Sequence, residues 1–361
     1  MVTRDMLKRA PKVELHDHID GGLRPVTVID LATEYRIELP STDPEELSAW
    51  LHRGANRKSL GLYLEGFSVT CGVMRTREAI ERVAREAIED LAEDGVVYAE
   101  LRFAPVLHVR DDLDLESIVE AALRGLEAGK KATGTCYGLI LCAMRNMSPS
   151  LSLETAELAV SYRDRGVVAF DIAGDESGHP PKRHIDAFQY IRNKNFNITI
   201  HAGEAFGPES IWQALQVCGA HRIGHGTRLI EDMAISGARI DKMGSLASYV
   251  RDRRIPLECC LSSNVQTGVA ADYASHPFNV LYRNDFRVSL CTDNRLMSQT
   301  SLTNEFLLAV EHFGLTIRDV ERISINAMKS AFVPYGERVR LIFDVIKPRY
   351  ARLRDETNPH D

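Results

Sequence analysis

The stretch TREAIERVAREAIEDLAEDGVVYAELRF, residues 76–103, contains both kinds of element from which the chain is built. Its first part predicts a helix over Thr76–Glu93, because apolar residues recur at helical spacing and charged residues fill the opposite face. The apolar positions are Ile80, Val83, Ala84, Ala87, Ile88 and Leu91. Gly95 favours a helix end here, since glycine readily adopts the left-handed conformation that closes helices. The run Val96–Phe103 is nearly continuously apolar, which predicts a parallel strand buried on both faces.

Runs of this kind alternate with helical segments along the chain. The other predicted strands are Lys12–His18, Tyr137–Met144, Val167–Ala173, Asn197–Ala202, Arg222–His225, Ile255–Leu261 and Phe286–Thr292. The other predicted helices between them are Leu115–Ala128, Ser152–Arg165 and Lys182–Lys194. Eight strands alternating with helices predict an α/β fold of the (β/α)8 TIM-barrel type. A doubly wound open sheet is the alternative, but no G-x-G-x-x-G motif follows any of the strands.

The chain is longer than a minimal barrel. A barrel needs about 250 residues, so the 361 residues leave roughly a hundred for additions. These fall in Pro25–Gly72, after the first strand, and after Arg295, and both regions have helical patterns. Within the first, Leu60–Phe67 (LGLYLEGF) has the aromatic and aliphatic mix of a lid over a pocket. No linker, repeat or low-complexity tract divides the chain, which predicts one domain over residues 1–361.

The composition excludes several classes of protein. Hydrophobic residues at 44% and charged residues at 26% are typical of globular proteins and exclude disordered and fibrous ones. With 44 basic and 51 acidic residues the net charge is −7, which disfavours nucleic acid and anionic membranes as partners. No apolar run reaches the ~18–20 residues of a membrane helix, and no signal-peptide pattern opens the chain. Seven scattered cysteines without a C-x-x-C pair favour a reducing compartment, and so a cytoplasmic protein. Composition does not predict the oligomeric state.

Polar residues gather at the C-terminal ends of the predicted strands. They are His16, His18, His201, Glu204, His225 and Asp293. His16 and His18 are separated by one residue on a strand and therefore point to the same side. The C-terminal strand ends of barrels carry the active site. Three neutral imidazoles and one carboxylate suit a single Zn²⁺ ion, with room for a water whose pKa the metal lowers.

Each of these signals has an ordinary structural explanation when it is taken alone. An H-x-H pair on a strand is often a pair of core or surface histidines, and Ile223–Thr227 (IGHGT) could be a simple turn. The sequence Thr292–Asn294 (TDN) could form an Asx-turn or begin a helix. Because every one of them falls at the same end of a separately predicted strand, we favour a metal site over these alternatives.

Six stretches, in this order, make the sequence similar to the adenosine deaminase family of metal-dependent amidohydrolases. They are Val13–Gly22 (VELHDHIDGG), Val167–Glu176 (VVAFDIAGDE), His201–Glu204 (HAGE), His221–Gly226 (HRIGHG), Ser262–Asn264 (SSN) and Cys291–Asn294 (CTDN). The resemblance extends from about Lys12 to the last predicted strand, and its combination of motifs is specific. The continuations Asn264–Gly268 (NVQTG) and Asn294–Ser298 (NRLMS) most resemble the bacterial, actinobacterial-type branch.

The resemblance implies a role for each of the strand-end residues. One zinc ion per chain would be bound by His16, His18, His201 and Asp293. Glu204 would protonate N1 of a purine while a metal-activated water adds at C6, which requires a carboxyl group whose pKa is raised. His225 and Asp293 would take or share the proton of that water.

Substrate contacts follow from the same resemblance. Asp20 matches a contact to a ribose hydroxyl, His18 lies beside it at the metal, and Gly174 matches a backbone amide that donates to N3. Asn294 stands where many members carry an Asp that hydrogen-bonds N7; an Asn amide donates without needing protonation. Cys291 replaces a frequent Asn and is expected to point into the barrel near the metal.

The implied reaction is zinc-dependent hydrolytic deamination of adenosine and 2′-deoxyadenosine to inosine and 2′-deoxyinosine, with release of ammonia, as in purine salvage. A deaminase of 6-amino-6-deoxyfutalosine, adenine or an N6-methylated nucleotide is the alternative. Asp20 disfavours free adenine, and the absence of an Arg/Lys cluster beside the strand-end motifs disfavours nucleotides. A two-metal hydrolase of this superfamily is less favoured, because Val167–Ala173 contains no Lys to bridge the metals. A catalytically silent nucleoside-binding protein is disfavoured because the ligands and Glu204 are all present.

Overall fold

The computed structural model describes residues 2–357. Its main sheet has eight parallel strands in the order β1-β2-β3-β4-β5-β6-β9-β10. The strands are β1 (Lys12–His18), β2 (Val96–Phe103), β3 (Cys136–Met144), β4 (Val167–Ala173), β5 (Asn197–Ala202), β6 (Arg222–His225), β9 (Leu257–Cys259) and β10 (Val288–Leu290). The chain after β10 returns to β1: the Asp293 amide donates to the His16 carbonyl at 2.8 Å, and the His18 amide donates to the Asp293 carbonyl at 2.7 Å. These two bonds close the sheet, so the predicted (β/α)8 TIM barrel is confirmed.

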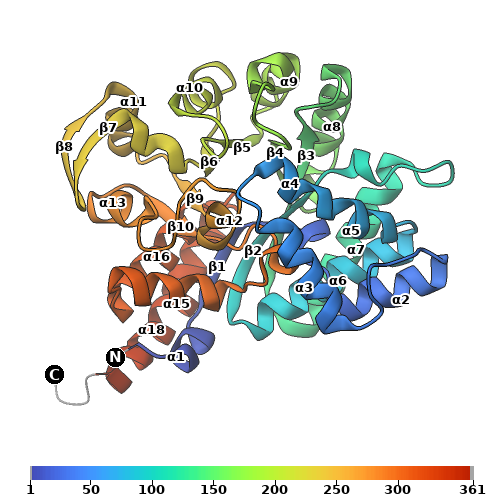
Figure 1. The fold of residues 1–361 in the computed structure, drawn as a ribbon, viewed down its shortest axis with the longest axis horizontal. Coiled ribbons are helices and arrows are strands. Elements are labelled where there is room, and N and C mark those ends of the chain that lie inside the picture. The colour runs from blue at the N-terminus through green and yellow to red at the C-terminus, as the bar shows by residue number, and fades with distance from the viewer. Residues whose placement is uncertain (1, 358–361) are drawn as a thin grey trace.

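Helices surround the barrel, as Figure 1 shows. Those that connect consecutive barrel strands are α6 (Arg77–Glu93), α7 (Leu115–Thr133), α8 (Pro149–Ser161), α9 (Ile185–Asn193), α10 (Pro208–Trp212), α11 (Ser245–Asp252), α12 (Leu261–Gln266) and α13 (Phe278–Arg283). The apolar positions predicted on the first of these helices are all buried. Its N-terminus is capped by the Thr76 side chain, which accepts from the Ala79 amide.

Several predicted boundaries were wrong. The seventh and eighth strands are shorter than Ile255–Leu261 and Phe286–Thr292, because the chain turns into α12 at Leu261 and towards β1 after Cys291. The helix predicted over Leu115–Ala128 continues to Thr133 and ends at Gly134 in the left-handed conformation. The helices predicted over 152–165 and 182–194 each include a short 3₁₀ turn at one end, over 163–165 and 181–184.

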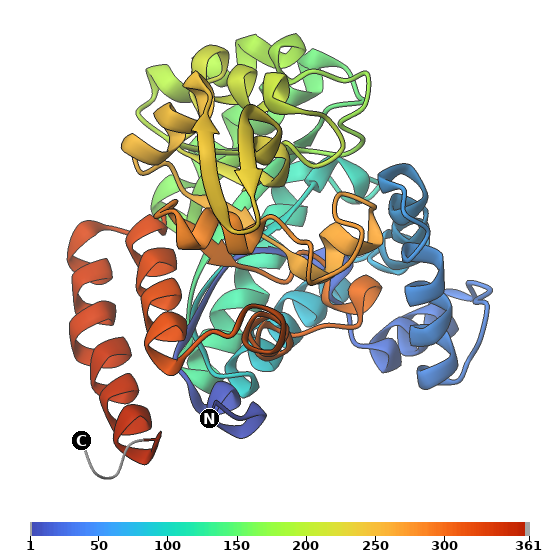
Figure 2. The ribbon, with the colours of Figure 1, turned by 60° about the vertical axis from the view of Figure 1, so that its left-hand side comes forward.

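The additional helices lie in the two regions that the sequence predicted. Between β1 and β2 the chain forms α2 (Pro25–Tyr35), α3 (Pro44–Ala55), α4 (Leu60–Tyr63) and α5 (Phe67–Val73). After β10 it forms α14 (Arg295–Ser298), α15 (Leu302–Phe313), α16 (Ile317–Ser330), α17 (Tyr335–Arg340) and α18 (Lys347–Thr357), with a π-helical stretch over Leu341–Ile346; α1 (Arg4–Arg9) precedes β1. Figure 2 shows α2–α5 in blue on one side of the barrel and the C-terminal helices in red on the other.

A two-stranded antiparallel hairpin, which the sequence did not predict, is inserted between β6 and β9. It comprises β7 (Met233–Ser236) and β8 (Arg239–Met243), and it appears in yellow at the front of Figure 2. Its residues are exposed or half-buried, so it lacks the apolar pattern that identified the barrel strands.

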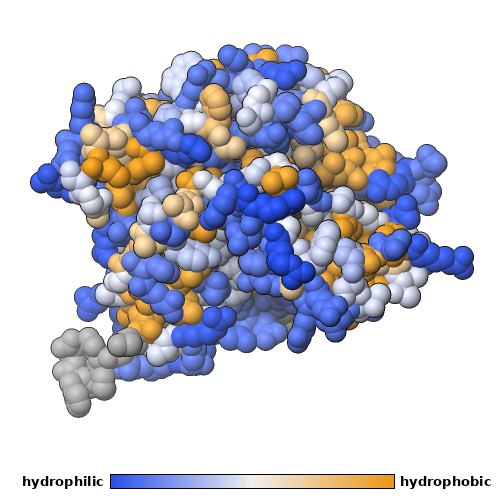
Figure 3. Space-filling view, in the orientation of Figure 1, coloured by the Kyte–Doolittle hydropathy of each residue, from blue (hydrophilic) through white to orange (hydrophobic). Residues whose placement is uncertain are grey.

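The surface and the cysteines complete the description. In the view of Figure 3, hydrophilic residues predominate near the centre and hydrophobic residues form separate patches towards the edges. Within residues 2–357, no helix is long and apolar enough to span a membrane. All seven cysteines are unpaired.

Candidate metal centre and active site

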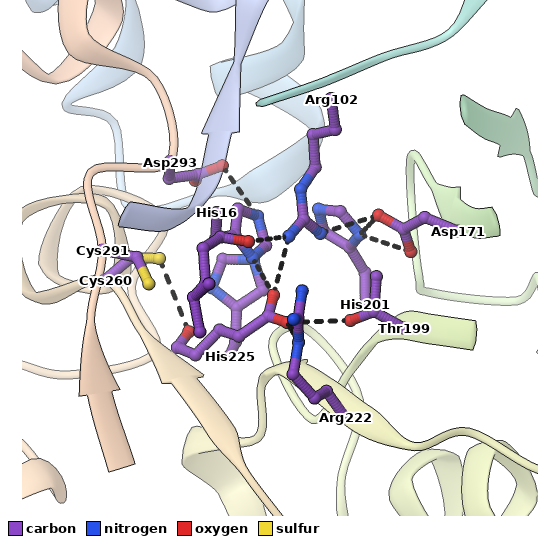
Figure 4. A network of polar contacts seen from close by, with 12 residues as sticks. His16, Arg102, Asp171, Thr199, His201, Arg222, His225, Cys260, Cys291 and Asp293 are labelled. Atoms are coloured by element: carbon purple, nitrogen blue, oxygen red, sulfur yellow. Dashed lines mark hydrogen bonds and ion pairs between the residues drawn. The ribbon is translucent and has the colours of Figure 1, made fainter. Parts of the chain in front are cut away.

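Four predicted ligands meet at the C-terminal end of the barrel. They are His16 and His18 from β1, His201 from β5 and Asp293 after β10, and their ligand atoms lie within 4.8 Å of one another. Asp293 Oδ1 is 3.3 Å from His16 Nε2 and 3.5 Å from His18 Nε2, and the latter is 3.2 Å from His201 Nε2. Three of these four side chains are labelled in Figure 4. All four are buried, so the cluster is a preformed polar site inside the protein.

The electrostatics of this cluster suit a cation. Burial, reinforced by the neighbouring imidazoles of His201 and His16, holds the pKa of His18 well below its usual range and leaves the ring neutral. Burial opposes ionisation of Asp293, but the adjacent His16 imidazole, whose Nε2 is 3.3 Å from Asp293 Oδ1, outweighs it and holds the pKa of this carboxyl well below its usual range. His16 Nε2 is a buried atom that has no hydrogen-bond partner among the described residues. The ionised carboxylate, the neutral imidazoles of His18 and His201 and the unsatisfied nitrogen of His16 form a donor set for a metal ion.

Charged side chains behind the cluster orient its imidazoles. Glu258 Oε2 lies 2.8 Å from His16 Nδ1, and Asp171 Oδ2 lies 3.0 Å from His201 Nδ1. Arg102 donates to both of these carboxylates, at 2.9 and 2.8 Å, and Figure 4 shows it beside Asp171. Each carboxylate turns the far ring nitrogen of its histidine towards the metal position. None of the three was predicted from the sequence; the available signal was a charged residue within a predicted barrel strand.

Glu204 and His225 lie beside the metal ligands. His225 Nε2 is 3.5 Å from Glu204 Oε2, and both side chains are buried. Burial raises the pKa of Glu204 well above its usual value, and the carboxylates of Asp293 and Glu176 add to the effect. Glu204 is therefore placed to hold a proton near neutral pH.

The hydrogen bonds of Asn264 determine where His225 carries its hydrogen. The Asn264 side-chain oxygen accepts from Thr227 Oγ1 at 2.9 Å, so its amide nitrogen donates to His225 Nδ1 at 3.1 Å. Burial, together with the nearby imidazole of His16, holds the pKa of His225 well below its usual range. The ring is then neutral, with its hydrogen on Nε2 facing Glu204.

The backbone at two of these positions is strained. His225 and Asp293 have φ angles of 63° and 61°, in the left-handed region that few side chains other than glycine adopt. Each residue directly follows or ends a short strand, and the conformation turns its side chain towards the cluster. Such strain persists only where the surrounding structure holds it, and in Asp293 the two backbone bonds to β1 do so.

Glu176 fixes the loop that carries Glu204. Its carboxylate accepts from four successive backbone amides, those of residues 203–206, at 2.8, 2.9, 2.6 and 2.9 Å. Four N–H bonds to one carboxylate keep the Glu204 backbone at a fixed distance from the cluster.

A cavity of about 330 Å³ opens over the cluster. Among its lining residues are eight that the sequence predicted: His18, Asp20, Gly174, His201, Glu204, His225, Asp293 and Asn294. Leu60, Leu64 and Phe67, from the stretch predicted to form a lid, line its apolar side. His16 lies below the cavity and does not line it. The cavity is largely apolar with a few convergent polar groups, as small-molecule sites are.

Two glycines bring the backbone close to this cavity. Gly174 has a φ of 96°, and a Cβ atom there would lie 3.1 Å from the Met144 side chain. A Cβ atom on Gly21 would lie 1.8 Å from Asn294 Oδ1, so only glycine leaves room for the Asn294 side chain. Asn294 Oδ1 is buried and has no hydrogen-bond partner among residues 2–357.

The wall around Asp20 contains two residues that the sequence analysis did not single out. His108 Nε2 is 3.6 Å from Asp20 Oδ2, and Cys71 Sγ is 3.9 Å from the same oxygen. His108 is fully buried beside Asp20. Cys291 is buried with its Sγ 3.6 Å from Ser289 Oγ, and burial raises the pKa of its thiol well above the usual value.

The chain is similar to several known proteins along nearly its whole length. The chain matches the family profile described as "Adenosine deaminase" over residues 11–348. It is 55% identical to "Adenosine deaminase 1" of Streptomyces coelicolor, covering 98% of this chain and 90% of that one, and 52% identical to "Adenosine deaminase" of Mycobacterium marinum, covering 98% and 99%. Among solved structures, the Arabidopsis N6-mAMP deaminase is 28% identical with a TM-score of 0.81, covering 94% of this chain and 98% of that one. The fold is also that of an adenine deaminase from Arthrobacter aurescens, 24% identical with a TM-score of 0.84, covering 95% and 98%.

Proposed function

The chain belongs to the adenosine deaminase family, and from that premise we propose that it is a zinc enzyme that hydrolyses adenosine and 2′-deoxyadenosine to inosine and 2′-deoxyinosine, with release of ammonia. The observation that carries the proposal is the buried carboxyl group of Glu204, whose raised pKa keeps a proton beside the metal-ligand cluster in one cavity. This arrangement supplies an acid and a metal site to the same face of a bound molecule.

The cluster fits zinc. Ligands of a tetrahedral zinc site lie about 3.3 Å apart, given bond lengths of about 2.0–2.1 Å to nitrogen and oxygen. The three measured separations, 3.2, 3.3 and 3.5 Å, agree with this spacing. The residues that would hold the ion are His16, His18, His201 and Asp293, one ion per chain. When bound, zinc supplies Lewis acidity that lowers the pKa of a water towards neutrality.

Three residues give, accept or share a proton at the reacting atoms: Glu204, Asp293 and His225. Glu204 holds the proton that N1 of the purine needs as C6 is attacked, because the aromatic ring resists attack until N1 is protonated. Asp293, ionised and next to the metal position, accepts the proton of the attacking water. His225, neutral with its hydrogen on Nε2, donates a hydrogen bond to the oxygen that adds at C6.

The remaining polar groups of the cavity orient the nucleoside. Asp20 accepts from a ribose hydroxyl, beside His18 at the rim of the cluster. The Gly174 amide donates to N3, and the Asn294 side-chain amide donates to N7. Phe67 and the leucines near it cover the flat faces of the base with apolar surface.

Other 6-aminopurine substrates are the second candidates. Solved neighbours include an adenine deaminase and an N6-mAMP deaminase, and others of them were determined with IMP or GMP. No Arg or Lys is found among the described residues that line the cavity, which disfavours a substrate phosphate there. Asp20 supports a substrate that carries a sugar. A cytoplasmic location also remains a prediction.

The test is ultraviolet-monitored deamination of adenosine, 2′-deoxyadenosine, adenine and 6-amino-6-deoxyfutalosine by the zinc-loaded protein. We expect rapid turnover of both nucleosides, loss of activity after chelation and recovery with zinc. Turnover of adenine or futalosine alone would keep the mechanism and change the substrate. Zinc-loaded protein that is inactive on all four compounds would overturn the proposal.

A further inference from the structure

A second cavity lies at the opposite end of the barrel from the metal cluster. It has a volume of about 650 Å³ and is formed around the N-terminal ends of β4, β5, β6, β9 and β10. Residues of α17 and of the turn after α16 form one side of it. We call it the basal cavity. None of the described residues that line it also lines the active-site cavity.

The basal cavity is strongly cationic in a chain whose net charge is −7. Its lining includes seven basic residues: Arg163, Arg222, Arg253, Arg254, Arg287, Lys329 and Arg338. Asp164 is the one acidic residue among the described residues of the lining, and it is exposed. Apart from Arg222, none of the seven forms an ion pair with a carboxylate within residues 2–357. The excess positive charge is therefore concentrated in one hollow and is not neutralised by the protein.

Several donors in this cavity are buried and unsatisfied. Arg287 Nε, Arg338 Nε and Arg222 Nη2 have no hydrogen-bond partner in the described part of the chain. Burial and the neighbouring charge of Arg254 both lower the pKa of Arg287, and no carboxylate opposes them. A buried charged donor without an acceptor is unfavourable, so an anion that brings acceptor oxygens into this cavity would be bound by these three donors.

The floor of the cavity is rigid. Arg222 is buried, pairs with Glu100 and Glu258 at 2.6 Å each, and donates to the Ser330 carbonyl at 2.9 Å. The ring of Phe332 lies against its guanidinium group, 3.8 Å from centroid to carbon. A guanidinium that is already held in place loses little conformational entropy when it binds a ligand.

We infer that the basal cavity binds a multivalent phosphate anion, either inorganic pyrophosphate or the phosphate chain of a nucleotide. Phosphate oxygens are acceptors only, and a chain of two or three phosphates carries enough charge to face several guanidinium groups at once. A single basic hollow suits a small anion, whereas nucleic acid requires a basic surface that continues beyond one hollow. This site is separate from the deaminase reaction and does not depend on it.

The experiment is isothermal titration of the zinc-loaded full chain with inorganic pyrophosphate at low salt, with the zinc content measured before and after. We expect one site per chain and an affinity that falls with added salt. The test variant is Arg287→Gln combined with Lys329→Gln, since neither side chain has an ionic partner whose loss would unfold the protein. We expect it to bind at least tenfold more weakly. Arg287→Lys alone should retain most of the affinity because the charge remains.

The matched control is Arg4→Gln combined with Arg318→Gln, two exposed arginines outside the cavity that remove the same charge. Binding equal to that of the unmodified chain is expected. A similar loss in both double variants would show a diffuse charge effect and overturn the site, as would no binding at 10 mM pyrophosphate. A titration with UTP separates the two sources, because tighter binding than pyrophosphate identifies a nucleotide. If a 20-nucleotide single strand bound more tightly than either, and the test variant abolished that binding, a small-anion site would be excluded.

Discussion

The two ends of the barrel differ in the kind of charge that they leave unpaired. At the C-terminal end, imidazoles and the ionised carboxylate of Asp293 form a donor set for a cation. At the N-terminal end, arginines that include Arg287 line a cavity in which several buried donors have no partner among the described residues. Both are features of one barrel, at opposite ends of its strands. The comparison shows that local charge, and not the net charge of the chain, determines what each end can bind.

One ion-pair network separates these two ends. Glu258 accepts from Arg222 on the basal side and from Arg102 and Thr199 within the barrel, and it contacts His16 on the metal side. Figure 4 shows the labelled members of the network together. The carboxylate that orients a metal ligand is thus itself held by an arginine of the basal cavity. The imidazole of His16 is therefore oriented by residues on the basal side of the barrel as well as by the loops at the C-terminal end.

The largest expected effect tests the acid at the C-terminal end. Glu204→Gln should lower kcat about a thousandfold, within the range of about 10²–10⁴ for general acids, while zinc content stays at one per chain. Its amide fills the same space but cannot give a proton to N1. The matched control is Glu305→Gln, which alters another fully buried carboxyl with a raised pKa that does not line the cavity. Near-normal kcat in the Glu204 variant would remove the proton-donor role.

The second prediction concerns the network between the ends. Arg222→Met should lower the free energy of unfolding by about 3–5 kcal/mol, because it leaves Glu100 buried without its cation and removes one of the two arginines that pair with Glu258. Urea unfolding measures the change, with the exposed Arg318→Met as the control, for which we expect less than about 0.5 kcal/mol. If the two variants were equally stable, the pairing across the barrel would not hold Glu258 in place.

The sequence predicted the catalytic end better than the basal end, and the reason is physical. Catalytic residues follow strands directly, so an H-x-H pair and a TDN turn could be placed at one edge from the strand order alone. The network behind them joins residues far apart in sequence: Arg102 pairs with Asp171 and Glu258, 69 and 156 residues away. A charged residue in an apolar strand is visible in the sequence, but its partner is not.

Neither the basal cavity nor the β7–β8 hairpin could be predicted from the sequence, and the reasons differ. The cavity collects arginines from residues 163 to 338, and only the closed barrel brings them together. The net charge of −7 is a sum over the whole chain, so it does not reveal a local group of arginines. The β7–β8 hairpin is exposed, so neither face has the apolar alternation of a half-buried strand. The one indication of this hairpin in the sequence was Gly237. It lies in the turn between the two strands and has a φ of 62°.

The third prediction concerns Glu305, a buried carboxyl group with a raised pKa. Burial raises the pKa of Glu305 from its ordinary 4.5 to about 7, while hydrogen bonds from Ser262 and Thr300 act in the opposite direction. A raised pKa in the folded state stabilises the protein below pH 4.5, and this contribution is lost as pH rises through 7. Relative to Glu305→Gln, the unmodified chain should lose about 3 kcal/mol of unfolding free energy between pH 5 and pH 8. Parallel pH profiles for the two proteins would contradict a proton on Glu305.

The smallest expected effect concerns Asn294. It tests whether a neutral hydrogen-bond donor at the catalytic end contacts the purine ring. Asn294→Ala should lower kcat/KM for adenosine about tenfold, the value of one hydrogen bond of about 1.4 kcal/mol. Asn294→Asp separates hydrogen bonding from size, because a carboxyl can donate to N7 only while protonated, and burial beside Asp293 favours that form. Its kcat/KM should therefore approach that of the unmodified enzyme at pH 6 and fall towards the Ala variant at pH 8. A pH-independent Asp variant would mean that position 294 contacts the base without donating to it, and that the neutral donor at this end lies elsewhere.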